Sequence, residues 1–278
     1  MKLFRHGAPG AERAGAIDAH GVKRDLSLLV PDITPDWLSP EKLAALAAID
    51  LTKMPAVPEG ARIGAPVGGV RQFLAIGLNY GKHATETGAQ PPKEPILFNK
   101  AITSIQGPDD DVKWPDGSEQ MDWEVELGVI IGTTARKVSK ADALKHVAGY
   151  CLANDVSERH WQIHRGGQWV KGKSFDTFGP LGPYLVTSDE IANPQDLPVS
   201  LKVNGVMRQN SNTSDMIFPV AEIVSHLSQF MTLLPGDVIV TGTPEGVGLG
   251  MKPPVFLKRG DVMELDGGVL GKQRQKVV

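Results

Sequence analysis

Cysteine is almost absent from this sequence of 278 residues, in which Cys151 is the single example. One cysteine excludes a disulfide within the chain and is typical of a protein that works in a reducing compartment. Cys151 lies within an apolar run that predicts a strand, so we interpret its thiol as a packing group rather than a nucleophile. We therefore expect a cytoplasmic protein.

Long apolar runs and runs of one charge are also missing. No apolar stretch approaches the ~20 residues that cross a bilayer, and the first residues lack the apolar core of a signal peptide. The formal net charge is −3 and no basic cluster occurs, which disfavours nucleic acid and anionic membranes as partners. With 41% hydrophobic residues, the chain can bury a substantial core, as an enzyme or a binding protein does.

Turn-forming residues divide the chain into two predicted parts. Residues 1–65 contain two short predicted strands and a helix that Ser39 caps and Pro40 begins. A connector rich in proline and glycine follows. We therefore place a small N-terminal domain at 1–65 and a larger domain at 66–278.

Three further elements are predicted in the larger part. Asn204 and Gly205 predict a type I′ hairpin turn. Ser139 predicts the start of a helix that continues to residue 147, and Pro219 predicts the start of another. The second helix carries an apolar stripe that we expect to lie in the core, made of Val220, Ile223, Val224, Leu227, Phe230 and Met231.

Two glutamates lie just before an apolar run that predicts a buried strand over 127–131. Side chains alternate along a strand, so Glu124 and Glu126 should face the same side. Asp155 follows a second apolar segment, 149–154. Three carboxylates that converge from strand ends suit Mg²⁺ or Mn²⁺, although ordinary solvated acids at a strand end would give the same spacing.

A histidine and a glutamate follow the predicted strand over 71–77. His83 and Glu86 are three residues apart, so on a helical turn they share one face. A carboxylate raises the basicity of a neighbouring imidazole and fixes its tautomer, as a water-activating base requires; an exposed surface pair has the same spacing. The proline-rich stretch 88–95 predicts a mobile connector, which would make this turn part of a lid.

The segment after Asp155 predicts a short helix over 157–164, with Arg159 and Gln162 on one face. His160 and His164 are four residues apart on the same helix, which raises the alternative of a zinc site. The usual metalloprotease pattern has glutamate directly after the first histidine, where this chain has tryptophan. We therefore do not expect zinc here.

Two glycine-containing stretches lie further along the chain. Residues 169–180 predict a loop, which either approaches a ligand or is a solvated basic loop. The spacing of Gly246, Gly248 and Gly250 does not match the dinucleotide-binding fingerprint. A turn over 241–248 that exposes backbone N–H groups and threonine hydroxyls would instead suit a substrate carboxylate.

Taken together, the motifs resemble those of the fumarylacetoacetate hydrolase family over roughly residues 70–270. Each motif alone is weak, but their shared order is specific. They are Gly77-Leu78-Asn79-Tyr80-x-x-His83-x-x-Glu86, Glu124-x-Glu126-Leu127-Gly128, Asp155-x-x-x-Arg159-x-x-Gln162, Lys173-Ser174-Phe175 and Thr241-Gly242-Thr243-Pro244.

The resemblance implies a fold and a set of site residues. The family fold is a β-rich, mixed α+β roll of largely antiparallel sheets, here with a small N-terminal α/β domain, and it is usually assembled as a homodimer. The residues that match its metal ligands for Mg²⁺, Mn²⁺ or Ca²⁺ are Glu124, Glu126 and Asp155. Those that match its catalytic groups are His83, Glu86 and Lys173, and those that match substrate contacts are Tyr80, Arg159, Gln162, Gly242 and Thr243.

The resemblance also implies an activity on a 2-oxo acid. It indicates metal-dependent hydrolysis of the C3–C4 bond of an acylpyruvate or a 2,4-diketo-3-deoxy sugar acid, giving pyruvate and a second carboxylic acid. The His83–Glu86 pair favours hydrolysis over other reactions of the superfamily, which are oxaloacetate-type decarboxylation, isomerisation and a ureidoglycolate lyase-like reaction. A non-catalytic protein stabilised by a cation is the alternative from another class.

Overall fold

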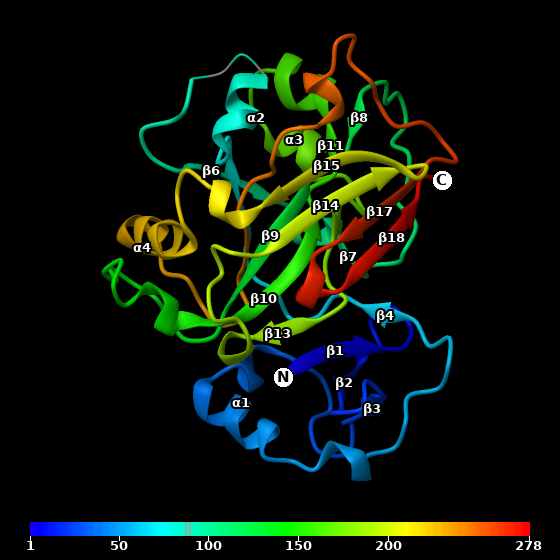
Figure 1. Cartoon of the computed structure of the whole chain (residues 1–278), viewed down its shortest axis with the longest axis vertical. Helices are drawn as coiled ribbons and strands as arrows, with labels where there is room; N and C mark the ends of the chain where they lie inside the picture. The colour runs from blue at the N-terminus through cyan, green and yellow to red at the C-terminus, as the bar shows by residue number, and fades with distance from the viewer. Residues whose placement is uncertain (87, 89) are drawn as a thin grey trace.

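The computed structural model describes residues 1–86, 88 and 90–278, coloured along the chain in Figure 1. Its main feature is a long sheet in which, within the described residues, neighbouring strands are antiparallel except for β16 and β5. A short strand, β4 (Ile63–Gly64), pairs with β1 beside this row. The row consists, in spatial order, of β3 (Lys23–Asp25), β2 (Arg13–Ile17), β1 (Lys2–His6), β13 (Leu185–Thr187), β10 (Val147–Asn154), β9 (Val125–Ile131), β16 (Val238–Val240), β5 (Phe73–Gly77) and β6 (Ile96–Lys100).

A second, antiparallel sheet packs beside the first. In spatial order its strands are β15 (Val206–Asn212), β14 (Pro198–Val203), β17 (Val262–Asp266) and β18 (Lys272–Lys276). Asn204 and Gly205 join β14 to β15 with φ angles of 50° and 76°, as the predicted type I′ turn requires. Two short pairs complete the strands, β8 (Met121–Asp122) with β11 (Ser157–Glu158), and β7 (Ile105–Gln106) with β12 (Gly179–Pro180).

Helices are short and lie around the sheets. The α-helices are α1 (Pro40–Ala47), α2 (Gly81–Glu86), α3 (Val170–Lys173) and α4 (Val220–Phe230), and η5 (His160–His164) is a π-helical turn. The 3₁₀ turns are η1 (Pro35–Trp37), η2 (Leu51–Lys53), η3 (Ile102–Ser104), η4 (Ala143–His146), η6 (Ser188–Glu190), η7 (Thr213–Asp215), η8 (Gly248–Gly250) and η9 (Gly268–Leu270). Within the described chain, no helix combines the length and apolarity needed to cross a membrane. The strand-rich, mixed architecture confirms the predicted fold class.

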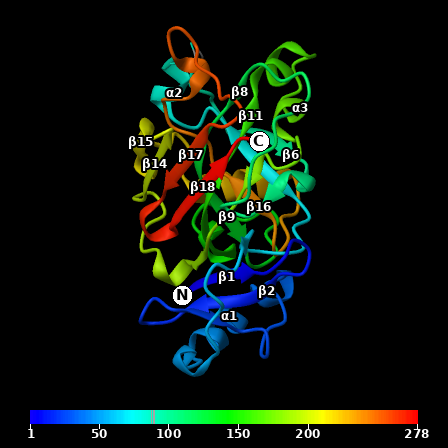
Figure 2. The same cartoon turned by 90° about the vertical axis from the view of Figure 1, so that its right-hand side faces the viewer.

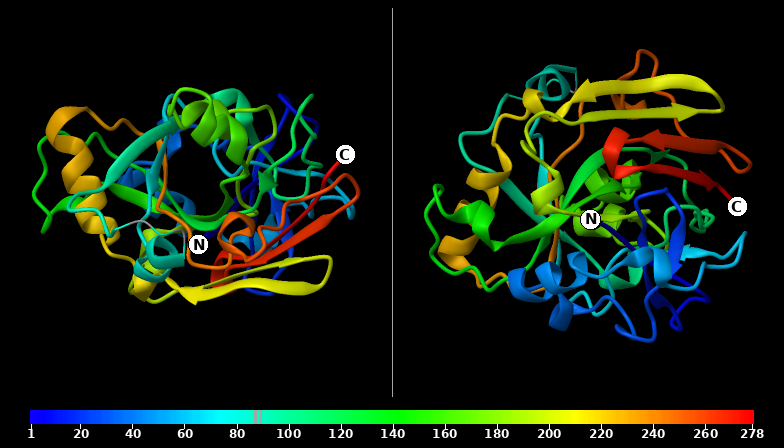
Figure 3. Two further views of the ribbon diagram at one scale, coloured as in Figure 1. Left: turned by 90° about the horizontal axis from the view of Figure 1, so that it is seen from above. Right: turned by 60° about the horizontal axis from the view of Figure 1, so that its bottom comes forward.

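The strand β9 is buried on both faces, which explains its continuous apolar sequence. Leu127 and Val129 belong to a core that also contains residues of β14 and α4, whereas Ile130 belongs to the core shared with the N-terminal segment. Seen from above, the strands are arranged around the middle of the molecule (Figure 3). Any misplacement of β9 would therefore disturb two cores at once.

Cys151 lies in β10 opposite Gly128 of β9. A Cβ atom on Gly128 would lie 2.6 Å from the Cys151 sulfur, so glycine leaves the space that the thiol fills. The side chain is fully buried, and burial raises the pKa of its thiol to about 12. These contacts are those of a packing residue.

The N-terminal segment adds to the main sheet rather than forming a sheet of its own. In β1, Lys2 pairs with Val186 and Leu3 pairs with Leu185, both antiparallel. Figures 1 and 2 show this segment at one end of the molecule, next to β13. The sheet thus continues across the boundary expected near residue 65, and the two-domain division stays a prediction.

Three predictions gave the wrong type of secondary structure. The helix expected over 139–147 is only the 3₁₀ turn η4, because residue 147 already begins β10. In the segment 157–164, the first residues pair with β8 as β11 before the π-helical turn begins. The loop expected over 169–180 contains α3 and β12. The expected connector over 88–95 includes Ala89, which lies outside the described residues.

One residue of the predicted apolar stripe of α4 lies outside the core. Ile223, Val224 and Leu227 are buried, but Phe230 at the end of the helix is 58% exposed. Met231, the residue after the helix, is partly buried and packs against the core, so Phe230 alone among the predicted stripe residues faces solvent. Phe230 is therefore not a core residue in this structure.

Replacing Ile223 should test this assignment. Ile223→Ala leaves a cavity in the core and should cost ~2–5 kcal/mol of unfolding free energy, whereas Phe230→Ala at the exposed end should cost about 0.5 kcal/mol. Each kcal/mol of lost stability lowers the melting temperature by ~2–4 °C, so thermal scans at one rate should separate the two variants clearly. Equal losses would show that this face of α4 does not lie in the core.

Candidate active site

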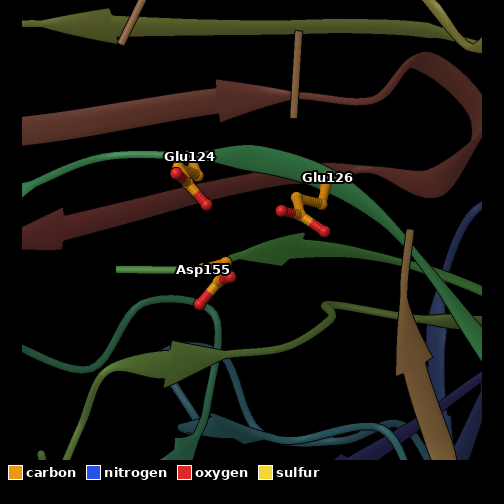
Figure 4. Close-up of side chains that lie close together, drawn as sticks. All are labelled: Glu124, Glu126 and Asp155. Carbon is orange, nitrogen blue, oxygen red and sulfur yellow. The ribbon is translucent and has the colours of Figure 1, made fainter. Parts of the chain in front are cut away.

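The three predicted metal ligands meet at the ends of two adjacent strands. Glu126 lies in β9, Glu124 lies one residue before that strand, and Asp155 directly follows β10. The Asp155 amide donates to the Glu124 carbonyl oxygen at 2.8 Å, which continues the antiparallel register of the two strands. The carboxyl groups point toward one another (Figure 4), and one oxygen of each lies within 4.8 Å of the others. All three side chains are buried.

Cationic side chains from other elements compensate these buried charges. Lys173, the last residue of α3, donates to Glu124 Oε2 at 2.6 Å and to Asp155 Oδ2 at 2.7 Å. Lys100, the last residue of β6, donates to Asp155 Oδ1 at 2.5 Å. Arg159 Nη2 lies 2.7 Å from Glu124 Oε1. Such pairs offset the cost of burying each ion, which is several kcal/mol when no partner is present.

Glu124 and Glu126 differ in how well their charge is compensated. Burial alone would raise the pKa of Glu124, but the charges of Lys173 and Arg159 outweigh burial and lower that pKa to about 2. Burial and the neighbouring Asp155 and Glu124 raise the pKa of Glu126 well above its usual value. Glu126 accepts the Gly242 N–H at 2.6 Å, yet no ammonium or guanidinium in the described part of the chain forms an ion pair with it.

This donor set fits a hard divalent cation. Carboxylate oxygens are the protein ligands that Mg²⁺, Mn²⁺ and Ca²⁺ prefer. A cation among the three carboxylates would also supply the positive charge that Glu126 lacks. The structure thus brings together the residues that the sequence predicted as ligands, and the identity of the ion stays a prediction.

His83 and Glu86 share α2, as the spacing predicted, with His83 Nδ1 3.6 Å from Glu86 Oε2. They are not an exposed surface pair, because the His83 side chain is only 7% exposed. Both carboxylate oxygens of Glu86 accept the Gly246 N–H, at 3.1 and 3.0 Å. A Cβ atom on Gly250 would lie 2.3 Å from the Glu86 carboxyl carbon, so glycine permits this close contact. The turn carrying the pair is therefore docked on residues 246–250.

A pocket of about 220 Å³ is lined by His83 of this pair and by Glu124 and Glu126, whereas Glu86 and Asp155 lie outside its lining. The predicted site residues in its lining are His83, Glu124, Glu126, Arg159, Gln162, Lys173 and Thr243. The remaining lining is apolar apart from backbone and comprises Ile76, Gly77, Leu78, Phe98, Ile163, Trp169 and Leu249. The pocket thus joins a charged region to an apolar one.

Three of the predicted substrate contacts, Tyr80, Gly242 and Thr243, differ in their positions and in the protein groups they contact. Thr243 Oγ1 donates to the Val125 carbonyl oxygen at 2.9 Å, and the Gly242 N–H is occupied by Glu126. Tyr80 is buried outside the pocket lining, and burial followed by the Glu126 charge raises the pKa of its phenol. Their roles in substrate binding stay predictions. Within the described residues, His160 and His164 are exposed and belong to no group of three or more potential metal ligands.

Sequence reasoning missed two residues that support the site. Asp122 accepts the Gly248 N–H at 2.7 Å, the Leu249 N–H at 3.0 Å and Arg159 Nε at 2.8 Å. Asp122 lies two residues before Glu124, as Glu124 lies two before Glu126, so the alternation of side chains along a strand could have identified it. Lys100 gave a weaker signal, a lysine at the end of an apolar strand.

This sequence is similar to known proteins over nearly its whole length. The family model described as "Fumarylacetoacetate (FAA) hydrolase C-terminal" matches residues 72–278. A Burkholderia ambifaria protein named "Putative hydrolase" is 56% identical over 276 residues, which are 99% of this chain and 98% of that protein.

Two solved structures extend the comparison to the fold. The fumarylacetoacetate hydrolase of Exiguobacterium antarcticum has a TM-score of 0.87 at 38% identity, covering 100% of this chain and 99% of that one. The 5-carboxymethyl-2-hydroxymuconate delta-isomerase of Mycobacterium smegmatis has a TM-score of 0.78 at 33% identity, covering 100% and 98%. Sequence motifs, fold and relatives agree, and we conclude that this chain belongs to the fumarylacetoacetate hydrolase family, a superfamily of enzymes.

Proposed function

We propose that this chain is a divalent-metal-dependent hydrolase that cleaves the C3–C4 bond of a 2,4-dioxo acid to give pyruvate and a second carboxylic acid. The substrate would be an acylpyruvate or a 2,4-diketo-3-deoxy sugar acid. The observation that carries the proposal is the position of His83, which lies beside Glu86 and lines the same pocket as Glu124 and Glu126. Hydrolytic cleavage requires a base for water next to a site that stabilises negative charge.

The carboxylates Glu124, Glu126 and Asp155 would hold the cation, which we expect to be Mg²⁺, with Mn²⁺ or Ca²⁺ as alternatives. When bound, the cation would supply positive charge near the 2-oxo acid end of the substrate and so stabilise the negative charge that develops as the bond breaks. Lys173 contributes a further buried positive charge at Glu124 and Asp155. Negative charge that develops on the substrate would thus be stabilised by groups already in place.

His83 would accept a proton from water while the water oxygen forms a bond to C4 of the substrate. Glu86, held by the Gly246 N–H, would fix the imidazole tautomer and stabilise the imidazolium that forms. The C3–C4 bond then breaks and its electron pair stays with C3. Protonation of C3 gives the methyl group of pyruvate, and the acyl part leaves as a carboxylic acid, so that one water is consumed for each bond broken.

The same carboxylates would also serve other reactions of the superfamily, since one related structure is named an isomerase. A histidine base with its own carboxylate partner supports hydrolysis, because decarboxylation needs no activated water. A non-catalytic protein would bind the cation and gain stability without turnover. The homodimer expected from the family resemblance forms part of this proposal.

Release of pyruvate is the direct test of the proposed activity. The protein should release pyruvate from acetylpyruvate or from a 2,4-diketo-3-deoxy sugar acid with Mg²⁺, and a chelator should abolish the reaction. The better of the two substrates would identify the subgroup. If neither releases pyruvate while the cation is bound, the hydrolase proposal is wrong, and decarboxylase and lyase assays would follow.

Replacing Glu86 should separate hydrolysis from decarboxylation. Glu86→Gln keeps an oxygen for the Gly246 N–H but removes the charge beside His83, so hydrolysis should fall by ~10²–10⁴-fold in kcat. Oxaloacetate decarboxylation, measured in parallel, should be affected far less. Glu222→Gln is the matched control, because Glu222 pairs with Lys140 on the surface. Unchanged hydrolysis in Glu86→Gln would contradict the role of the pair.

Replacing Glu126 should test the cation site independently of catalysis. Glu126→Gln removes one carboxylate ligand. Loss of a group that only hydrogen-bonds a metal ligand already lowers metal affinity by ~10–100-fold, so Mg²⁺ affinity measured by calorimetry should drop by about 100-fold or more. The thermal stabilisation by Mg²⁺ should vanish with it. Glu264→Gln, on the exposed face of β17, is the control. If Mg²⁺ binds both variants equally, Glu126 is not a ligand.

A further inference from the structure

The apolar part of the pocket lining is built by side chains that hold one another in place. Trp169 meets Phe98 edge to face, with ring centroids 5.4 Å apart. It also packs on the backbone of Gly77, where an added Cβ atom would lie 2.3 Å from the indole ring. Ile163 borders the same pocket and is 41% exposed. An exposed isoleucine beside a fixed aromatic pair offers a surface that an apolar ligand group would cover.

The cations of the pocket are already paired with carboxylates of the protein. Arg159 contacts Asp122 and Glu124, and Lys173 contacts Glu124 and Asp155. Among the described residues, no other lysine or arginine lines the pocket. A second carboxylate on the substrate would therefore leave water without gaining a cationic partner, which is strongly unfavourable.

The nearby basic groups do not change this conclusion. Arg165 lies outside the lining, with its guanidinium 3.9 Å from the centre of the Trp161 ring. Lys171 also lies outside it and donates to the Arg165 carbonyl oxygen at 2.8 Å. His83, the remaining basic side chain of the lining, lies beside Glu86.

We propose that the substrate carries a short, uncharged, apolar acyl group beyond C4, and that Phe98, Ile163 and Trp169 select this group over one that bears a carboxylate. This inference rests on the proposed function, which places the 2-oxo acid end of the substrate at the carboxylates. The volume of about 220 Å³ limits the length of the acyl group, because pockets for drug-sized ligands measure ~300–1,000 Å³. Within the proposed substrate class, the lining favours simple acylpyruvates over more polar sugar acids.

Binding of two 2-oxo acids that lack a 4-oxo group tests the selection without turnover. In 5-methyl-2-oxohexanoate, an isopropyl group replaces the second carboxylate of 2-oxoglutarate, so the pair differs in charge and hardly in size. Calorimetry with the Mg²⁺-loaded full-length chain should show at least ~10-fold tighter binding of the isopropyl compound. Equal binding, or tighter binding of 2-oxoglutarate, would overturn the inference. If neither compound binds, the proposed function itself fails and this inference fails with it.

A charge placed on the apolar lining should reverse the preference. Ile163→Arg adds a guanidinium at a side chain that is already 41% exposed, so the fold should tolerate it. Affinity for 2-oxoglutarate should rise by ~10-fold or more, while affinity for the isopropyl compound falls. Val206→Arg is the matched control, since Val206 is 53% exposed on β15 and outside the pocket lining. An unchanged preference in Ile163→Arg would show that Ile163 does not contact the acyl group.

Discussion

The pairing of β9 with β10 is the constraint on which the site depends. Ala153 lies opposite Glu126, and the Asp155 amide reaches the Glu124 carbonyl, so acids from two strands meet at one point. A slip of one residue would turn every side chain of a strand to the other face. Since β9 packs into separate cores on its two faces, the apolar packing that fixes the register also fixes the positions of the carboxylates.

Buried carboxylates in turn require cations, and the chain supplies them from elements that are distant in sequence. Lys100 ends β6, Arg159 precedes η5 and Lys173 ends α3. The last of these depends on a close backbone approach, because a Cβ atom on Gly172 would lie 2.3 Å from the Glu158 carbonyl oxygen. Glu126 alone among the three acids has no cation within ion-pair distance in the described chain. A cation bound among the three carboxylates would complete the electrostatic balance of the site.

The spacing of residues along the sequence predicted those features of the site that depend on residues close together in the chain. Alternation along one strand placed Glu124 beside Glu126, and helical spacing placed His83 beside Glu86. The predictions failed where distant contacts decide the structure: α3 forms where Gly172 packs on another segment, and Phe230 is exposed although Met231 beside it packs against the core. Single-sequence periodicity contains no information on where a core ends or which backbone segments touch. The same limit explains why Lys100 was missed.

The loop 246–250 links the two halves of the candidate site. Its Gly246 N–H holds Glu86 of the His83 pair, and its Gly248 N–H is held by Asp122. Asp122 also binds Arg159, which contacts Glu124. Hydrogen bonds, ion pairs and the backbone of the loop together thus connect the expected water base with the expected cation site. Because each link is buried or partly buried, displacing the loop would disturb the base and Arg159 together, so the position of the base relative to the carboxylates depends on this loop as well as on the pairing of β9 with β10.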